Sequence, residues 1–168
     1  MDLAPGDRKR LRARTWHESR PSAGCDDGDM ADLHVERTGV RQGLATNGRG
    51  AELRYGPVEV DGSFTPGELL ALALAACNLM SADHALVRRL GEHVRASGSV
   101  TTVKDVSTNS YVDSAVELTV GSADGSVDLD DEAWAQLLDV AERAIAQSCT
   151  VGRTLEHGLP HTLTVRRA

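Results

Sequence analysis

The 168-residue chain lacks an excess of basic charge and a long uninterrupted hydrophobic run. Its formal net charge is −7, so a basic surface of the kind that neutralises nucleic-acid phosphates is not expected. Its longest continuous apolar run, residues 69–77, is shorter than the roughly 20 residues that a membrane helix needs. We therefore expect neither nucleic acid nor a membrane among its partners.

Cysteine is also scarce, with Cys25, Cys77 and Cys149 far apart in the sequence. Three widely spaced cysteines do not form the disulfide framework of a small secreted domain. The chain also does not open on a charged segment, an apolar segment and a cleavage site, so no secretory signal is expected. A reducing cytoplasm is the simplest compartment for such a chain.

Residues 1–29 differ in character from the rest. A basic run at residues 8–14 and an acidic run at residues 26–29 flank a segment without apolar periodicity, and Cys25 lies within it. This composition predicts a disordered N-terminal extension. Residues 30–168 are long enough for one domain with a single core.

Strand patterns and helix patterns alternate along this domain. Apolar and polar residues alternate at 33–36 and 51–55, with Gly39 and Gly43 interpreted as turns, which predicts a small antiparallel sheet. The same alternation at 94–103 and 116–120 predicts a second sheet element, and residues 163–165 a last strand. The fold class expected from this order is α+β.

Two helices are predicted, and each carries one cysteine. Thr65 as N-cap, Pro66 at the first position and Glu68 completing a capping box predict a helix that runs to about residue 90. Its first three turns are apolar on every side, which is typical of a helix enclosed by protein. Acidic residues at 128–132 predict the start of a second helix, whose apolar face would include Cys149.

Thiol chemistry is the reactivity that these residues allow. A cysteine attacks only as its thiolate, and burial in apolar surroundings disfavours that form. A nearby arginine would compensate, since a cation at about 4 Å is worth on the order of 4 kcal/mol at an effective dielectric of 20. The candidates are Arg49, Arg41, Arg37 and Arg153, and spacing alone does not choose among them.

Plainer interpretations exist for each of these residues. An unpaired buried cysteine commonly packs as a small hydrophobic residue, and the capping box accounts for Glu68 without catalysis. His157 and His161 are separated by Gly158 and Pro160, so they do not share a helix face as zinc ligands would. No phosphate-binding loop or nucleophile-elbow serine occurs, so no metal or bound cofactor is expected.

Two segments resemble a known family. Residues 65–77, with the sequence TPGELLALALAAC, and residues 149–155, with the sequence CTVGRTL, are similar to the cysteine motifs of the OsmC/Ohr superfamily, the osmotically inducible and organic hydroperoxide resistance proteins. The order of sheet, cysteine helix, strands and cysteine helix fits as well, over about residues 33–167.

The resemblance implies an intertwined α+β homodimer with two active sites at the subunit interface. In such proteins the first cysteine attacks the peroxide and becomes a sulfenic acid, which the second resolves as a disulfide. Carried over, Cys77 would be the peroxidatic residue and Cys149 the resolving residue. The resemblance also implies an external dithiol reductant, for example of the lipoyl type, and an organic rather than inorganic hydroperoxide as substrate.

The chain also departs from the family pattern. The activating arginine of the family follows a Thr-Gly-Gly turn, and residues 46–49, TNGR, match it best, which favours Arg49. Hydroperoxidase members have glutamate directly after the helix-opening proline, where this chain has Gly67, with Glu68 one residue later and about 100° around the helix. Several members also have proline where this chain has Thr150.

Two functional hypotheses follow. The first is a thiol-dependent peroxidase that reduces organic hydroperoxides in oxidative-stress defence, with Cys77, Cys149, Arg49 and Glu68 as its catalytic residues. The second is a non-catalytic dimer that binds a small hydrophobic ligand or senses redox state. Retention of both thiols favours the first hypothesis, and the glycine at position 67 favours the second.

Overall fold

A computed structural model of the chain describes residues 32–92, 94–122, 125 and 127–167. The predicted extension at residues 1–29, including Cys25, lies outside these residues. The elements follow in the order β1 (His34–Gly39), β2 (Gln42–Thr46), β3 (Glu52–Tyr55), α1 (Pro66–Leu90), β4 (Val94–Asp105), β5 (Ser110–Ser122), α2 (Asp131–Ser148) and α3 (Thr150–His157).

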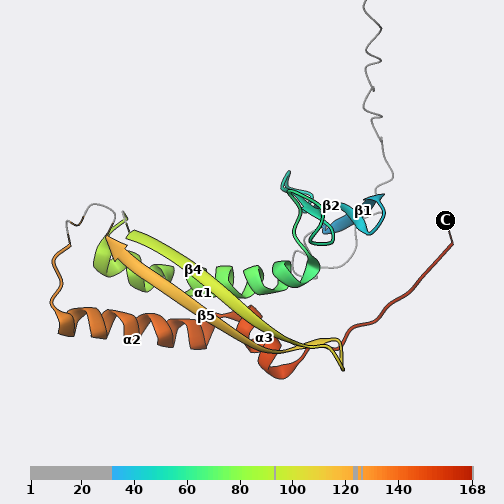
Figure 1. Cartoon of the computed structure of the whole chain (residues 1–168). Coiled ribbons are helices and arrows are strands. Elements are labelled where there is room, and N and C mark those ends of the chain that lie inside the picture. Colours follow the sequence, from blue (N-terminus) through green and yellow to red (C-terminus); the bar gives the residue numbers. More distant parts are fainter. Residues whose placement is uncertain (1–31, 93, 123–124, 126, 168) are drawn as a thin grey trace, which may run out of the picture.

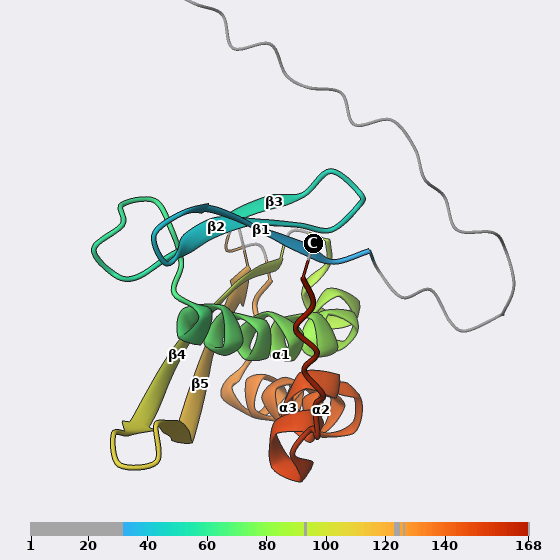
Figure 2. The same cartoon turned by 90° about the vertical axis from the view of Figure 1, so that its right-hand side faces the viewer.

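The strands form two separate antiparallel sheets, which confirms the predicted α+β class. One sheet has the order β1-β2-β3, and the other is the long hairpin of β4 and β5. Figures 1 and 2 show the three-stranded sheet on one side of α1 and the helices α2 and α3 on the other. The β4–β5 hairpin runs along α1, so α1 occupies the centre of the chain.

The central strand of the first sheet was not anticipated. Gly43 was interpreted as a turn, and this is wrong, since it lies inside β2 and pairs with Tyr55 of β3. A Cβ atom at position 43 would lie 2.4 Å from the Tyr55 hydroxyl oxygen. The glycine is therefore there to make room for an aromatic side chain that crosses the sheet.

Helix α1 begins as its sequence predicts. The Thr65 side chain accepts a hydrogen bond from the Glu68 N–H, and the Glu68 carboxylate accepts one from the Thr65 N–H, so the capping box is complete. The helix ends at Leu90, and Gly91 follows with a φ of 78°, a conformation that favours glycine. The whole of α1 is thus delimited by local sequence signals.

The core lies between the C-terminal half of α1 and helix α2. Leu86 and Ala82 of α1 are each 1% exposed, and Leu137 and Ala141 of α2 pack against them. Apolar residues at the open end of the β4–β5 hairpin extend this cluster. At Gly98 of β4 a Cβ atom would lie 2.8 Å from the Leu118 side chain, so a larger residue there would push the end of that side chain aside.

By length and composition alone, the 25-residue helix α1 could cross a membrane, although the apolar run inside it was expected to be too short. Core helices of water-soluble proteins meet the same criterion, and α1 packs against β4, β5, α2 and α3. Its exposed apolar residues include Leu70, Leu72 and Met80.

The second helix differs from its prediction. The chain leaves the α2 helix at Cys149 and immediately starts α3, so Cys149 is the C-cap of one helix and the N-cap of the next. It was expected to continue the face of α2 marked by Ile145, but its φ and ψ of −70° and 97° are extended rather than helical. The second cysteine is therefore at a corner of the chain.

The predicted last strand at residues 163–165 is wrong. The structure assigns no regular element to residues 158–167, and the Leu163 and Val165 side chains are more than four-fifths exposed. A strand forms only where another strand supplies partners for its N–H and C=O groups, and no strand in the described part of the chain pairs with this segment.

We expect Leu86→Ala to lower the free energy of unfolding by about 2–5 kcal/mol, because it leaves a cavity between α1 and α2. Chemical denaturation followed by circular dichroism measures this. Val106→Ala, at an 87% exposed position in the β4–β5 turn, is the control and should change stability by less than about 0.5 kcal/mol. Equal effects of the two substitutions would contradict the assignment of the core.

Candidate active site

The two cysteines outside the N-terminal segment meet where α1 packs against the start of α3. Cys77 lies in the middle of α1 and is half-buried, whereas Cys149 at the α2–α3 corner is only 3% exposed. Both are free thiols, and their side chains are close enough to share a hydrogen bond. The fold thus brings together two residues separated by about seventy positions in the sequence.

The first turn of α3 lies close to both sulfur atoms. The Gly152 N–H donates a hydrogen bond to the Sγ atom of Cys149 at 3.2 Å, so a thiol acts as the N-cap of this helix. A Cβ atom at position 152 would lie 3.2 Å from the same Sγ atom and 3.7 Å from the Leu74 side chain. Glycine at this position allows α3 to approach both the thiol and α1.

The pKa of the Cys77 thiol is lowered from its ordinary value. The main cause is a hydrogen bond from the Val151 N–H, and burial opposes it. The Cys149 thiol, the Thr150 N–H and the Ser81 hydroxyl, one turn along α1, lower this pKa further. Donors that point at a sulfur atom stabilise its thiolate form, so Cys77 is the residue prepared to ionise.

The pKa of the Cys149 thiol is raised, chiefly by burial. The Gly152 N–H lowers it, but the hydrogen bond that Cys149 donates to Cys77 and the charge of Cys77 both raise it again. The pair is therefore asymmetric, because Cys77 ionises more readily than Cys149 beside it.

No arginine contributes to this asymmetry within the described chain. The groups that lower the pKa of Cys77 are backbone N–H groups, a thiol and a hydroxyl, where the sequence had suggested a cation. Arg49 lies on the exposed turn between β2 and β3, where the Asn47 side chain accepts hydrogen bonds from the N–H groups of Arg49 and Ala51. Arg153 follows the first turn of α3 but adds nothing to the pKa of either thiol.

Glu68 forms the cap of α1. Its carboxylate oxygen Oε2 accepts hydrogen bonds of 2.7 Å from the Thr65 N–H and 3.0 Å from the Thr65 hydroxyl. Glu68 is nine residues before Cys77 on the same helix and contributes nothing to the pKa of that thiol. A structural role thus accounts for this residue, and its catalytic role remains a prediction.

The Tyr111 side chain lies against Gly67. Hydroperoxidase members of the OsmC/Ohr superfamily, which the sequence resembles, have glutamate at this position. A Cβ atom at position 67 would lie 1.8 Å from the Tyr111 hydroxyl oxygen and 2.8 Å from the ring carbon that bears it. Any side chain at position 67 would therefore displace Tyr111. The glycine and the tyrosine form a matched pair that replaces the carboxylate.

A groove of about 410 Å³ lies near the cysteine pair, between α1, the β4–β5 hairpin and α3, although neither cysteine lines it. Leu74 and Gly152, the two residues in contact beside the Cys149 sulfur, form one end of it. Apolar side chains from all three elements line its walls: Leu70, Ala71, Val112 and Leu155. A small apolar molecule in this groove would lie against Leu74 and Gly152, which border the Cys149 sulfur.

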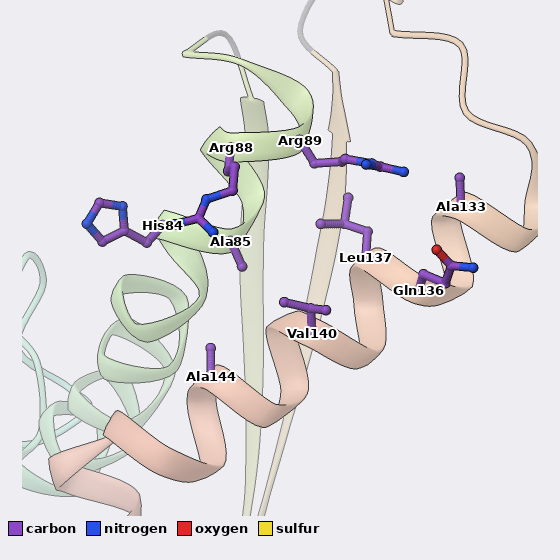
Figure 3. Close-up of a pocket in the computed structure, with 9 residues that line it drawn as sticks. All are labelled: His84, Ala85, Arg88, Arg89, Ala133, Gln136, Leu137, Val140 and Ala144. Carbon is purple, nitrogen blue, oxygen red and sulfur yellow. The ribbon is translucent and has the colours of Figure 1, made fainter.

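A second groove, of about 490 Å³, runs along one side of the contact between α1 and α2 (Figure 3). Figure 3 shows Arg89 extending from α1 toward α2, whereas His84 points away from it. Leu137, Val140 and Ala144 form its apolar side. The first groove, and not this one, includes Leu74 and Gly152, the neighbours of the Cys149 sulfur, so it is the groove nearer to the thiols.

Metal chemistry finds no support among the residues that the structure describes. Within residues 32–92, 94–122, 125 and 127–167, no group of three His, Cys, Asp or Glu side chains lies together as metal ligands would. The chemistry available at the cysteine pair is that of the two sulfur atoms and the donors around them.

Comparison with known proteins places this arrangement in a family. Residues 59–164 match the model of the family described as OsmC-like protein. An uncharacterized protein of Mycobacterium tuberculosis strain H37Rv is 41% identical over 138 residues, which are 81% of this chain and 96% of that protein. The chain belongs to the OsmC-like protein family.

Solved structures show the same fold. A putative osmotic stress induced and detoxification response protein from Psychrobacter arcticus 273-4 superposes with a TM-score of 0.59 at 20% identity, over 77% of this chain and 91% of the other. The organic hydroperoxide resistance protein OhrB of Bacillus subtilis gives a TM-score of 0.50 at 22% identity, over 75% and 90%. At these identities the likeness concerns the fold alone.

Several residues of this OsmC-like site were not found from sequence. Ser81 could have been, since residues four apart on a helix share a face and Ser81 follows Cys77 at that spacing. The N–H groups of Thr150 and Val151 could not, because their role depends on the chain turning at Cys149. Thr150 at this point also supplies an N–H group that the proline of other members lacks.

We expect Thr150→Pro to raise the pKa of Cys77, though not fully to the ordinary thiol value. The substitution removes one N–H donor to Cys77 but keeps that of Val151, the largest contributor. Proline suits the first position of a helix, and the extended Cys149 before it is compatible. The alkylation rate of Cys77 against pH, measured by peptide mass spectrometry, should shift to higher pH.

Thr150→Ala is the matched control for this substitution, because alanine keeps the N–H group. The alkylation profile of Thr150→Ala should therefore follow that of the wild type. If alanine and proline shift the profile equally, the side chain rather than the N–H group acts on the thiol.

We expect Glu68→Ala to lower the free energy of unfolding by about 0.5–2 kcal/mol, because it breaks the capping box. Glu68→Gln should restore much of this, since glutamine also completes such a box. Denaturation curves and the alkylation profile of Cys77 check both variants. A stable Glu68→Gln variant with an altered Cys77 profile would show that the charge of Glu68 acts on the thiol.

Proposed function

We propose that this OsmC-like protein reduces organic hydroperoxides through Cys77 and Cys149, as part of oxidative-stress defence. The observation that supports this most directly is the asymmetric thiol pair at the first turn of α3, in which the pKa of Cys77 is lowered and that of Cys149 is raised. An inert pair of core cysteines has no need of N–H donors directed at one sulfur atom.

In the first step the Cys77 thiolate attacks the terminal oxygen of the hydroperoxide. The O–O bond breaks, and its electron pair leaves with the alkoxide, which takes a proton from solvent and departs as the alcohol. Cys77 is oxidised to a sulfenic acid and the peroxide is reduced. The N–H groups of Val151 and Thr150 hold the thiolate in position for this attack.

In the second step the Cys149 sulfur attacks the sulfur of the Cys77 sulfenic acid. A disulfide forms, and the thiol proton of Cys149 leaves with the hydroxyl group as water. A dithiol such as one of the lipoyl type then reduces the disulfide by exchange and restores both thiols. Each thiol already affects the pKa of the other, which supports a resolving step without unfolding of α1 or α3.

The groove beside the pair supports an organic substrate. Aliphatic side chains of α1, β5 and α3 form one part of its walls and polar side chains the rest, and Leu74 and Gly152 border the Cys149 sulfur. Burial of an apolar body there contributes binding free energy in proportion to the area removed from water. Hydrogen peroxide has no such body, so the groove would add nothing to its affinity.

A homodimer with Arg49 of the partner subunit near the thiols completes the proposal. The described chain leaves apolar residues uncovered on α1, on β1 and in the C-terminal segment, among them Met80, Val35 and Val165. A second copy of the chain would cover such surface. The guanidinium of Arg49 forms no ion pair within the described residues, which leaves it available to a neighbouring site.

A ligand-binding dimer without catalysis is the second candidate, and the same apolar groove favours it. The two candidates differ in what they require of the sulfur atoms. A peroxidase needs a reactive Cys77 thiolate, whereas a binding protein needs only the groove.

We expect the wild-type protein to reduce cumene hydroperoxide or tert-butyl hydroperoxide with dihydrolipoamide as reductant. Cys77→Ser should lower turnover by at least about a thousandfold, because it removes the nucleophile. Cys149→Ser should keep a single round of peroxide consumption and accumulate the Cys77 sulfenic acid, which dimedone labelling detects. Arg49→Ala should lower turnover if this residue helps to ionise Cys77.

Serine at either position is close in size to cysteine, and circular dichroism confirms that each variant is folded. The proposal fails if wild-type protein turns over no hydroperoxide and forms no Cys77–Cys149 disulfide after oxidation. Co-purification of an apolar compound in that case would favour the ligand-binding dimer.

A further inference from the structure

Tyr111 owes its position to a bulge in the β4–β5 hairpin. The strands pair without interruption from Val94 opposite Ser122 to Val103 opposite Asp113, but Lys104 then pairs with Tyr111, which leaves Val112 as an extra residue. A bulge of this kind shifts one strand by one residue, so the side chains beyond the bulge point to the opposite face of the hairpin. Without the bulge the Tyr111 side chain would point away from α1, and with the bulge it points toward α1.

Gly67 receives this side chain on α1. The Tyr111 hydroxyl oxygen lies 1.8 Å from where a Cβ atom at position 67 would be, so the ring reaches the helix backbone itself. This hydroxyl forms no hydrogen bond with the described part of the chain. The bulge at Val112 of β5 and the glycine at position 67 of α1 together place the Tyr111 ring against the helix.

The ring stands between two hollows. The groove beside the thiols is lined by Tyr111 on the side away from Gly152. A second hollow of about 340 Å³ continues toward the start of α1 and includes Gly67 and Phe64. Tyr111, Ala71 and Thr102 line both hollows. On α1, Leu74, Ala71 and Gly67 follow one another at helical spacing, so the two hollows lie along one line.

We propose that Tyr111 is the specificity-determining residue of this site, a partition that limits how long an unbranched alkyl chain can extend from the thiols along α1. The ligand class is a straight-chain alkyl hydroperoxide, with its reactive end at Gly152 and its chain directed toward Tyr111. The inference rests on the proposed function for the reactive end. The chain-length limit itself depends only on the groove and its partition.

The chain-length dependence of binding tests the partition. The probes are alkan-1-ols from butanol to dodecanol, which carry the chain without the reactive peroxide, and calorimetry on the full-length protein measures their affinity. In the wild type each added methylene should increase affinity by roughly fourfold until the chain reaches Tyr111, and longer chains should gain nothing. In Tyr111→Ala the increase should continue to longer chains.

Gly67→Ala supplies an independent variant, because its Cβ atom displaces Tyr111 without shortening it. It should extend the limit as Tyr111→Ala does, and the double variant should extend it no further. Tyr111→Phe keeps the ring and should keep the wild-type limit. Val112→Ala is the matched control, since Val112 lines the groove beside the thiols but not the second hollow. It should leave the limit unchanged.

The same limit in wild type and in folded Tyr111→Ala would overturn the inference. Circular dichroism identifies any variant that does not fold, and Tyr111→Ala alone decides the matter if Gly67→Ala proves unstable.

Turnover of the matching alkyl hydroperoxides separates the two proposals. Turnover without a Tyr111-dependent limit rejects the partition and keeps the peroxidase, whereas a Tyr111-dependent limit in alkanol binding without turnover rejects the peroxidase and keeps the partition.

Discussion

The site depends on one contact, the approach of the first turn of α3 to the thiol of Cys77 in α1. The N–H groups at the start of a helix have no partners within the helix, and in this chain two of them point at a sulfur atom. Cys149 makes this possible, because the chain turns there and its thiol caps α3. A straight α2 continuing past Cys149 would have carried those donors away from α1.

Close approach of the elements around α1 requires residues with little or no side chain. Gly152 brings α3 against Cys149 and Leu74, and Gly67 admits the ring of Tyr111. Each glycine is matched to a specific neighbour, so the shape of the groove is set by pairs of residues that are distant in sequence. The helix between them stays fixed because its ends are defined locally, by the capping box at Thr65 and the glycine at position 91.

How much the sequence predicts depends on the range of the interactions involved. The bounds of α1 and the presence of β4 and β5 are predictable, because caps and alternation are local signals, although β5 begins at Ser110 rather than at the predicted 116. Local patterns misplace Gly43, whose role comes from Tyr55 across the sheet, and the last strand, which has no partner strand in the described chain. Cys77 and Cys149 are recognisable from the sequence as candidate site residues. Their surroundings cannot be recognised in this way, because they depend on the turn of the chain at Cys149 and on the bulge in the β4–β5 hairpin.

Because backbone N–H groups lower the pKa of Cys77, the thiolate depends less on an arginine side chain for its stabilisation. An arginine side chain loses conformational freedom when it is held against a thiolate, whereas the N–H groups of α3 are already fixed by the helix. The Cys77 thiolate is therefore stabilised before any cation arrives, and an arginine from elsewhere would add to that stabilisation. The corner at Cys149 also places this thiol beside Cys77, where burial raises its pKa although the N–H groups of the same first turn lower it.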